Sequence, residues 1–215
     1  MAKNFLVFFR GYIKTPSRTI GLILSIAFGI GIWGAMDMAF KCIPYTLDKF
    51  YAKTDFSDLE IQFLADDENN IPDLTTIDGI KSVEHRLILP GTVIKDGEKP
   101  LTSLLILTKS SNVGVNKLLL KSGRLNGPGN NEFVIERSLN EYQHYNIGDM
   151  ITFKVGEKVL NSKITGIAIS PEFFSMSSNP DFAIPEKGTL GVAYGNLSAF
   201  NEALGFTLVN DIIIS

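Results

Sequence analysis

The residues that could carry out chemistry are few and isolated from one another. The 215-residue chain contains two His, His85 and His144, and a single Cys, Cys42. His85 falls in an apolar segment that predicts a strand, His144 lies near the end of a predicted helix, and no His is near Cys42. A nucleophile needs an adjacent base, and a zinc site needs several Cys or His ligands. We therefore expect no enzymatic activity and no catalytic, metal-binding or cofactor-binding residue in this chain.

Known sequence motifs point the same way. The chain has no G-x-x-x-x-G-K-[ST] phosphate loop, no H-E-x-x-H zinc motif and no G-x-S-x-G nucleophile turn. Gly29, Gly31 and Gly34 match the dinucleotide pattern G-x-G-x-x-G, but no strand precedes them and they lie inside an apolar run. The acidic residues 66–68 lack the ligand spacing of a calcium loop and predict a solvated turn. Asn196 begins a formal glycosylation triplet but is better placed to cap a helix.

Charge is distributed unevenly along the chain. Residues 1–41 carry five Lys or Arg and one acidic residue, a net charge of +4, whereas the remainder carries 15 basic and 22 acidic residues, a net charge of −7. The whole chain has a net charge of −3 and a pI of about 5.4. This balance argues against a nucleic acid partner.

An apolar run follows the basic N-terminus. Residues 19–36 contain no charged side chain, and residues 38–40 extend the run beyond Asp37. About 20 helical residues cross a membrane, so we predict a transmembrane helix at residues 19–41 in contact with the lipid bilayer. Four Lys or Arg precede the run, which places residues 1–18 in the cytoplasm and the rest outside. The alternative is a cleaved signal peptide, but this run is longer than usual, and Met36, Asp37 and Met38 make a poor cleavage site.

Small residues recur within the apolar run. Ala27, Gly31, Ala35 and Ala39 are spaced by four, which would let another helix approach closely and predicts transmembrane packing at these positions. The alternative is that Gly and Ala are simply frequent in membrane helices. In residues 1–18, four aromatic side chains share one helical face, which favours an amphipathic segment at the cytoplasmic interface. A basic aromatic flank without that structure is the alternative.

The rest of the chain divides into a connector and a folded domain. Pro44 predicts a break and residues 42–58 a connector, after which residues 59–215 form one extracytoplasmic domain. Because strands mix with short helices, the fold class is α+β. Gly156 and Glu157 predict a hairpin turn, Ser138 a helix N-cap, and residues 127–131 a loop. The predicted strands are 59–64, 83–94, 101–108, 133–135, 151–155, 159–169, 190–194 and 210–214, and the predicted helices are 72–80, 112–121, 138–145 and 197–204.

The order of several short segments resembles a known family. They are Ser17-Arg18, Asp58-Leu59-Glu60-Ile61, Ile80-Lys81-Ser82-Val83-Glu84, Ser122-Gly123-Arg124-Leu125, Asn131-Glu132-Phe133-Val134-Ile135, Tyr145-Asn146-Ile147-Gly148-Asp149, Thr165-Gly166-Ile167-Ala168 and Ser170-Pro171-Glu172-Phe173. With the preceding span, this order is similar to the FtsX-like permeases of ABC systems, the superfamily of the macrolide exporters (MacB-type). The resemblance covers the first transmembrane helix and the periplasmic core domain.

The resemblance implies a non-enzymatic permease of the bacterial inner membrane. Such permeases have four transmembrane helices, pair with a second permease copy, and work with a separate cytoplasmic ATPase that binds the ATP. The motion of that ATPase is passed to the external domains, which act on a periplasmic adaptor or substrate protein. The resemblance brings no catalytic residue, and it implies that three further helices follow Ser215. The alternative is a single-span anchored binding or sensor protein, whereas an anchored hydrolase would need a catalytic pair that the sequence lacks.

Overall fold

The computed structural model describes residues 16–109, 114–127, 131–173, 188, 190–205 and 208–215. It comprises two compact units that divide between Lys49 and Phe50. The predicted amphipathic segment lies almost entirely outside the described residues, as does the middle of the predicted loop at 127–131.

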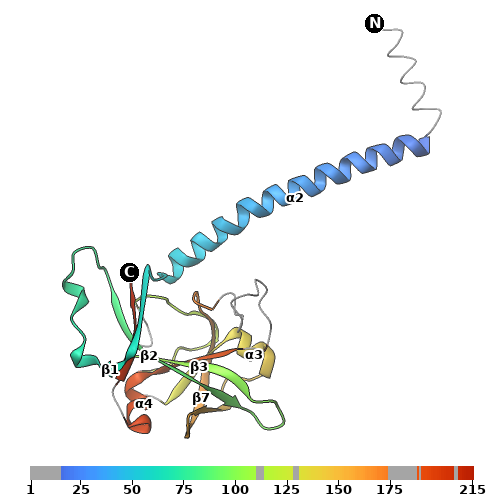
Figure 1. Ribbon diagram of the computed structural model, residues 1–215. Coiled ribbons are helices and arrows are strands. Elements are labelled where there is room, and N and C mark those ends of the chain that lie inside the picture. Colours follow the sequence, from blue (N-terminus) through green and yellow to red (C-terminus); the bar gives the residue numbers. More distant parts are fainter. Residues whose placement is uncertain (1–15, 110–113, 128–130, 174–187, 189, 206–207) are drawn as a thin grey trace. The chain divides into compact units, whose positions relative to one another are not determined.

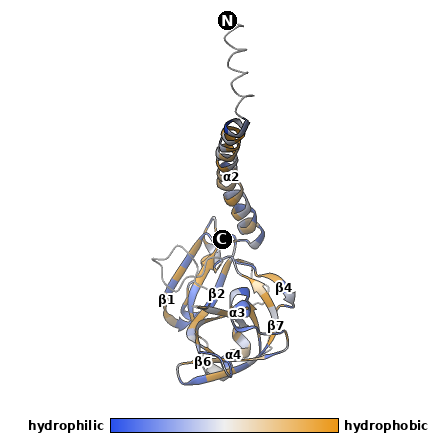
Figure 2. Cartoon of the chain, turned by 90° about the vertical axis from the view of Figure 1, so that its right-hand side faces the viewer, coloured by the Kyte–Doolittle hydropathy of each residue, from blue (hydrophilic) through white to orange (hydrophobic). Residues whose placement is uncertain are grey.

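The first element is a single long helix, α2 (Pro16–Thr54), of 39 residues. It is long and apolar enough to cross a membrane, a criterion that a signal sequence also meets, and hydrophobic residues occur along most of its length (Figure 2). The predicted break at Pro44 is wrong, because the helix continues to Thr54. The proline ring removes one backbone donor, which leaves the carbonyl of Phe40 without its intrahelical partner, but the turns on both sides remain helical. Residues 42–54 of the predicted connector are therefore the last part of α2.

The second unit is built on a nine-stranded sheet. Its strands are β1 (Leu59–Asp67), β2 (Val83–Ile94), β3 (Leu101–Thr108), β4 (Leu119–Gly123), β5 (Glu132–Glu136), β6 (Met150–Val155), β7 (Lys158–Ile169), β8 (Gly191–Asn196) and β9 (Leu208–Ile214). Two short helices accompany them, α3 (Arg137–Gln143) and α4 (Leu197–Leu204), and two 3₁₀ turns, η1 (Glu68–Asn70) and η2 (Leu74–Thr76). The domain is therefore α+β, as predicted, with strands predominating (Figure 1).

Six of the strands close into a barrel in the order β2-β3-β8-β5-β7-β6, because β6 pairs with both β7 and β2. The two longest strands, β2 and β7, make this closure. The end of β2 pairs with β6 and its beginning with β9, while the first half of β7 pairs with β6 and the second half with β4. β1 and β9 thus extend the barrel wall beyond β2, and β4 extends it beyond β7.

Apolar side chains from alternate strand positions form the main core. On β3, Leu105 and Leu107 belong to this core, whereas the intervening Ile106 belongs to a second cluster on the other face of the sheet. The rings of Phe133 and Phe200 stack with their centroids 4.8 Å apart. All these side chains are fully buried, so the hydrophobic effect favours the closed wall.

The predicted elements differ from the structure at three places. All eight predicted strands and the hairpin at Gly156 are present, as are helices at 137–143 and 197–204. The predicted helix at 72–80 is wrong, since only the 3₁₀ turn η2 forms there, capped by Asp73. The predicted helix at 112–121 is also wrong, because its last residues belong to β4 and pair with β7, where tertiary pairing outweighs weak local propensity. The N-cap of α3 is Glu136 and not Ser138, whose backbone N–H donates to the Glu136 carboxylate.

Gly195 offers a test of the barrel core. A Cβ atom there would lie 2.8 Å from side-chain carbons of Leu107, Phe133 and Phe200, all in the fully packed interior. We expect Gly195→Val to lower the free energy of unfolding by about 1–3 kcal/mol, measured by urea unfolding of the full chain in detergent. In the control Gly114→Ala, the new Cβ meets only the movable Ser82 hydroxyl at 3.1 Å, so its effect should be small. Equal stability of the two variants would contradict this description of the core.

Candidate functional site

The candidate catalytic side chains do not form a reactive site. Among the described residues, no three His, Cys, Asp or Glu side chains are grouped as a metal site. His85 lies on β2 with Nδ1 2.7 Å from the Glu68 carboxylate. Cys42 is an exposed residue of α2. Asp67 caps η1 by accepting from the Asn69 N–H, so the acidic run 66–68 forms a capped turn.

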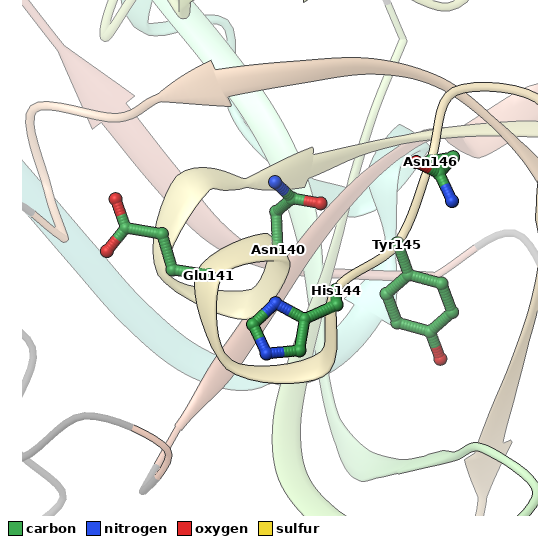
Figure 3. Close-up of a pocket in the computed structure, with 5 residues that line it drawn as sticks. All are labelled: Asn140, Glu141, His144, Tyr145 and Asn146. Atoms are coloured by element: carbon green, nitrogen blue, oxygen red, sulfur yellow. The ribbon is translucent and has the colours of Figure 1, made fainter.

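His144 lies beside a shallow surface hollow, but its own role is to end α3. Its backbone has φ of +51° and its N–H donates to the Asn140 carbonyl, the geometry of a helix C-cap. The side chains of Glu141, His144 and Tyr145 point in different directions (Figure 3). Burial raises the pKa of Tyr145 to about 12, with a further contribution from Asp149, far from the near-neutral value that general acid–base catalysis requires.

Asn196 also has a structural role. It is fully buried, and its side-chain oxygen accepts hydrogen bonds from the backbone N–H groups of Ser198 and Ala199. This is the helix N-cap that the sequence predicts, at the start of α4.

The most distinctive constellation surrounds the end of α2. The helix terminates at Asp55, whose φ is +46°, and the Phe56 N–H donates to the Tyr51 carbonyl at 3.1 Å. The rings of Tyr51 and Phe56 stack with centroids 4.6 Å apart. The hydrogen bond and the aromatic contact together form a Schellman motif, which stops the helix at a defined residue.

This helix end is fastened to the segment before β4. The carbonyls of Thr54 and Asp55 accept hydrogen bonds from the backbone N–H groups of Lys117 and Asn116, at 2.7 and 2.9 Å. The Lys117 ammonium also pairs with the Asp55 carboxylate, and this hydrogen bond lowers the pKa of Asp55. Two carbonyls at the helix end, which an isolated helix leaves unsatisfied, thus find donors in the domain. We call the contacts of residues 51–57 with 116–117 the junction.

Asn116 connects the junction to the interior of the domain. Its side-chain oxygen accepts from the Ser57 N–H at 2.7 Å, and its amide nitrogen donates to the Ser57 hydroxyl and to the Glu172 carboxylate. Its φ of +51° is a conformation that Asn adopts more readily than most residues.

Arg86 of β2 extends the chain of contacts into the sheet. Its side chain is almost fully buried, and its guanidinium donates to Asp211 at 2.6 Å and to Glu172 at 2.5 Å. A third carboxylate, that of Glu60, lies 3.6 Å from Nη2. The set of Arg86, Glu60, Glu172 and Asp211, here called the Arg86 cluster, therefore joins β1, β2, β9 and the segment after β7. Through Asn116 and Glu172 it is in direct hydrogen-bonded continuity with the end of α2.

The Arg86 cluster holds three carboxylates against one guanidinium. Burial by itself would lower the pKa of Arg86, but the Glu172 and Asp211 carboxylates outweigh it and raise that pKa, so Arg86 stays protonated. For Asp211, burial outweighs the opposing effect of Arg86, and nearby Glu60 adds to it, which raises the pKa of Asp211 to about 6. As the pH falls, the cluster therefore takes up a proton on a carboxylate, Asp211, while Arg86 keeps its own.

The last residue of the chain lies at the same end of the domain. Asp58, which precedes β1, donates its N–H to the Ile214 carbonyl at 2.8 Å, and the Ser215 carbonyl accepts from Lys81 and Ser82. A polar crevice of about 360 Å³ lies here; it is lined by Tyr51, Ala52, Asp55, Phe56, Asp58, Lys81 and Ser215.

The predicted packing residues lie on α2 itself. Ala27, Gly31, Ala35 and Ala39 are all within the helix and exposed, and a Cβ built on Gly31 would meet no atom within 4 Å apart from the adjacent backbone of the helix itself. Transmembrane packing at these positions stays a prediction. A second stripe, of large apolar residues, follows Met36, Phe40, Ile43, Leu47 and Phe50 at alternating spacings of four and three. This is the spacing of a helix that packs along another helix.

The junction and the Arg86 cluster were not predicted. Two signals were present, because Arg86 and Asp211 are charged residues next to apolar runs of predicted strands, where an unpaired buried charge would be costly. The sequence did not predict that these two residues form an ion pair, because 125 residues separate them.

Asp211 makes stability depend on pH. Because its pKa is higher in the folded chain than in the unfolded chain, folding takes up a proton, and this contribution to stability falls as pH rises from about 4 to about 6. We therefore compare the free energy of unfolding of Asp211→Asn with that of wild type, by urea unfolding at two pH values. The difference, variant minus wild type, should be about 1–3 kcal/mol more positive at pH 7.5 than at pH 4.5. The control is Asp96→Asn in the exposed β2–β3 turn. A wild-type-to-variant difference independent of pH would contradict the prediction.

The comparisons with known proteins concern the domain. No family model and no curated protein matches the chain. Among solved structures, the extracellular domain of the noncanonic ABC-type transporter YknZ from Gram-positive bacteria is similar, with a TM-score of 0.51 and 14% identity over 73% of this chain and 81% of that chain. The periplasmic region of MacB from Actinobacillus actinomycetemcomitans aligns with a TM-score of 0.47 and 18% identity over 72% of this chain and 65% of that one. The chain therefore has the fold of the extracellular domain of an ABC-type transporter, which confirms, at the level of the fold, the resemblance that the sequence predicts.

Proposed function

We propose that this chain is the N-terminal part of the membrane subunit of an ABC transport system of the FtsX-like, MacB-type superfamily. In this proposal α2 anchors the chain in the bacterial cytoplasmic membrane, with residues 1–18 in the cytoplasm and the barrel domain outside. Three features support it: the fold shared with the extracellular domain of YknZ, the apolar character of α2, and the net charge of +4 in residues 1–41.

The observation that carries the proposal is the junction. α2 runs without interruption through Pro44 to Thr54, and its last turn is bonded directly to Asn116 and Lys117 of the domain. A protein that only tethers a domain can use a flexible linker, whereas one that transmits motion needs a stiff connection. A displacement of the helix end would reach β2 and β9 through Asn116, Glu172 and Arg86.

The chemistry of the system resides elsewhere in this proposal. A separate cytoplasmic ATPase binds and hydrolyses ATP, and this chain has no catalytic task. The membrane subunit works with a second permease copy, and the domain acts on an envelope substrate or adaptor protein. The small-residue stripe at 27, 31, 35 and 39 and the large apolar stripe at 36–50 give α2 two surfaces against which neighbouring helices could pack.

The orientation of α2 can be tested with the single native thiol. Cys42 is exposed and lies just beyond the apolar run, so a membrane-impermeant maleimide should label it in intact spheroplasts. In the matched double variant Cys42→Ala with Ser17→Cys, the thiol lies at the other end of the run, and labelling should require permeabilised membranes. Labelling of this double variant in intact spheroplasts would reverse the orientation. A labelled product that lacks its N-terminus would instead indicate a cleaved signal peptide.

The transport proposal itself predicts a specific partner and a coupling defect. The native gene product, tagged at its N-terminus and cross-linked in membranes, should co-purify with an ATPase that carries a G-x-x-x-x-G-K-[ST] motif. Insertion of Gly-Ser-Gly after Asp55 should leave this complex intact but reproduce the envelope phenotype shared by deletions of the two genes, because a flexible segment interrupts the junction.

The matched control is the same insertion after Asp96, in the exposed turn between β2 and β3, which should leave function unchanged. A product that carries no ATPase would favour a single-span binding or sensor protein. Full function of the Asp55 insertion variant would contradict a coupling role for the junction.

A further inference from the structure

β1 is an edge strand, and no strand of the described residues pairs with its outer side. It lies at one end of the strand order, beside β9 (Figure 1). The antiparallel register with β9 joins Leu59 to Ile214 and Gln62 to Asp211. Its apolar side chains are unusually exposed, with relative accessibilities of 53% for Leu59, 38% for Ile61 and 93% for Leu64. A strand edge presents unpaired backbone N–H and C=O groups to any extended chain that fits beside it.

The same region is strongly acidic. Residues 54–80 contain no Lys or Arg, and their eight acidic residues are Asp55, Asp58, Glu60, Asp66, Asp67, Glu68, Asp73 and Asp78. Some of these are engaged inside the domain, as Glu60 is with Arg86 and Asp55 with Lys117. Asp58, which precedes the strand, and Asp66, near its end, are exposed and take part in no ion pair among the described residues. The edge therefore combines exposed apolar side chains with negative charge.

A second copy of this chain is a poor occupant of the edge, because it would bring the same acidic segment, with eight acidic residues and no Lys or Arg in residues 54–80, against itself. Like charges on adjacent strands are destabilising. A strand with basic residues at alternate positions would instead place cations beside Glu60 and Asp58 and apolar side chains beside Leu59 and Ile61.

We propose that the outer edge of β1 binds an extended cationic segment of a partner polypeptide, with basic and apolar residues in alternation, by adding it to the sheet as a further strand. The regular part of the edge is Leu59–Gln62, because the register with β9 shifts between Gln62 and Asp66. Four residues span about 13 Å of edge, and Leu64 adds an exposed apolar contact beyond them. Main-chain hydrogen bonds would supply affinity, and the alternating side chains specificity. This inference goes beyond the proposed function, since it holds whether or not α2 transmits motion.

The test uses the full chain in nanodiscs of zwitterionic lipid. The probe is a fluorescein-labelled heptapeptide of alternating Lys and Val, with a Glu and Val heptapeptide and empty nanodiscs as controls. We expect the cationic peptide alone to bind, and to slow amide hydrogen exchange in residues 59–62. In Asp58→Lys with Leu64→Lys, its Kd should rise at least about tenfold.

The matched control is Asp96→Lys with Val159→Lys, which changes net charge equally at exposed positions on other strands and turns. Its Kd should stay within about twofold of wild type. Circular dichroism verifies folding, and Leu64→Asn, at a position that is 93% exposed, provides a milder edge variant. The proposal is overturned if the cationic peptide does not bind wild type, if the two double variants bind it equally, or if it binds without protecting β1.

Discussion

Closure of the barrel through β6 is the constraint on which the other features of the domain depend. β6 has six residues, yet it completes the wall because β2 and β7, with twelve residues each, both extend far enough to pair with it and with a second neighbour. Closure leaves the ring itself without an edge, and it encloses the aromatic cluster around Phe133. The open edges therefore belong to β1 and β4, at the two ends of the strand order.

The position of the charged residues follows from this arrangement. Arg86 lies where β2 pairs with β9 on one side and with the end of β3 on the other, and its side chain belongs to the face of the sheet opposite the aromatic cluster. A buried guanidinium is tolerated there because two carboxylates accept its hydrogen bonds. Burying these charges costs desolvation energy, but their contacts hold together β1, β2, β9 and the segment after β7, which lie far apart in sequence. Such a network favours one arrangement of these segments over alternatives that would leave a charge unpaired.

Local sequence patterns predicted much of the fold and little of the junction. The strands at 83–94 and 101–108 were readable because apolar runs flank the turn at Asp96 and Gly97, and the hairpin at Gly156 because alternation continues on both sides. β4 was missed, because Leu119 and Leu120 become strand residues only through pairing with β7. The prediction that the helix breaks at Pro44 was wrong. The helix ends ten residues later, where it is stopped by the aromatic contact of Tyr51 with Phe56 and by donors from Asn116 and Lys117, which lie more than 60 residues away in sequence. Barrel closure likewise depends on pairings between distant strands, which periodicity does not encode.

Asp58 and Ile214, near the two chain ends of the barrel domain, are joined by one hydrogen bond. Because β1 and β9 are paired strands, the stretch from Asp58 to Ile214 begins and ends at one place, and changes in the loops between them leave the spacing of these two residues unaltered. An insertion or deletion in one of those loops therefore leaves the helix end at Thr54 and Asp55 in place.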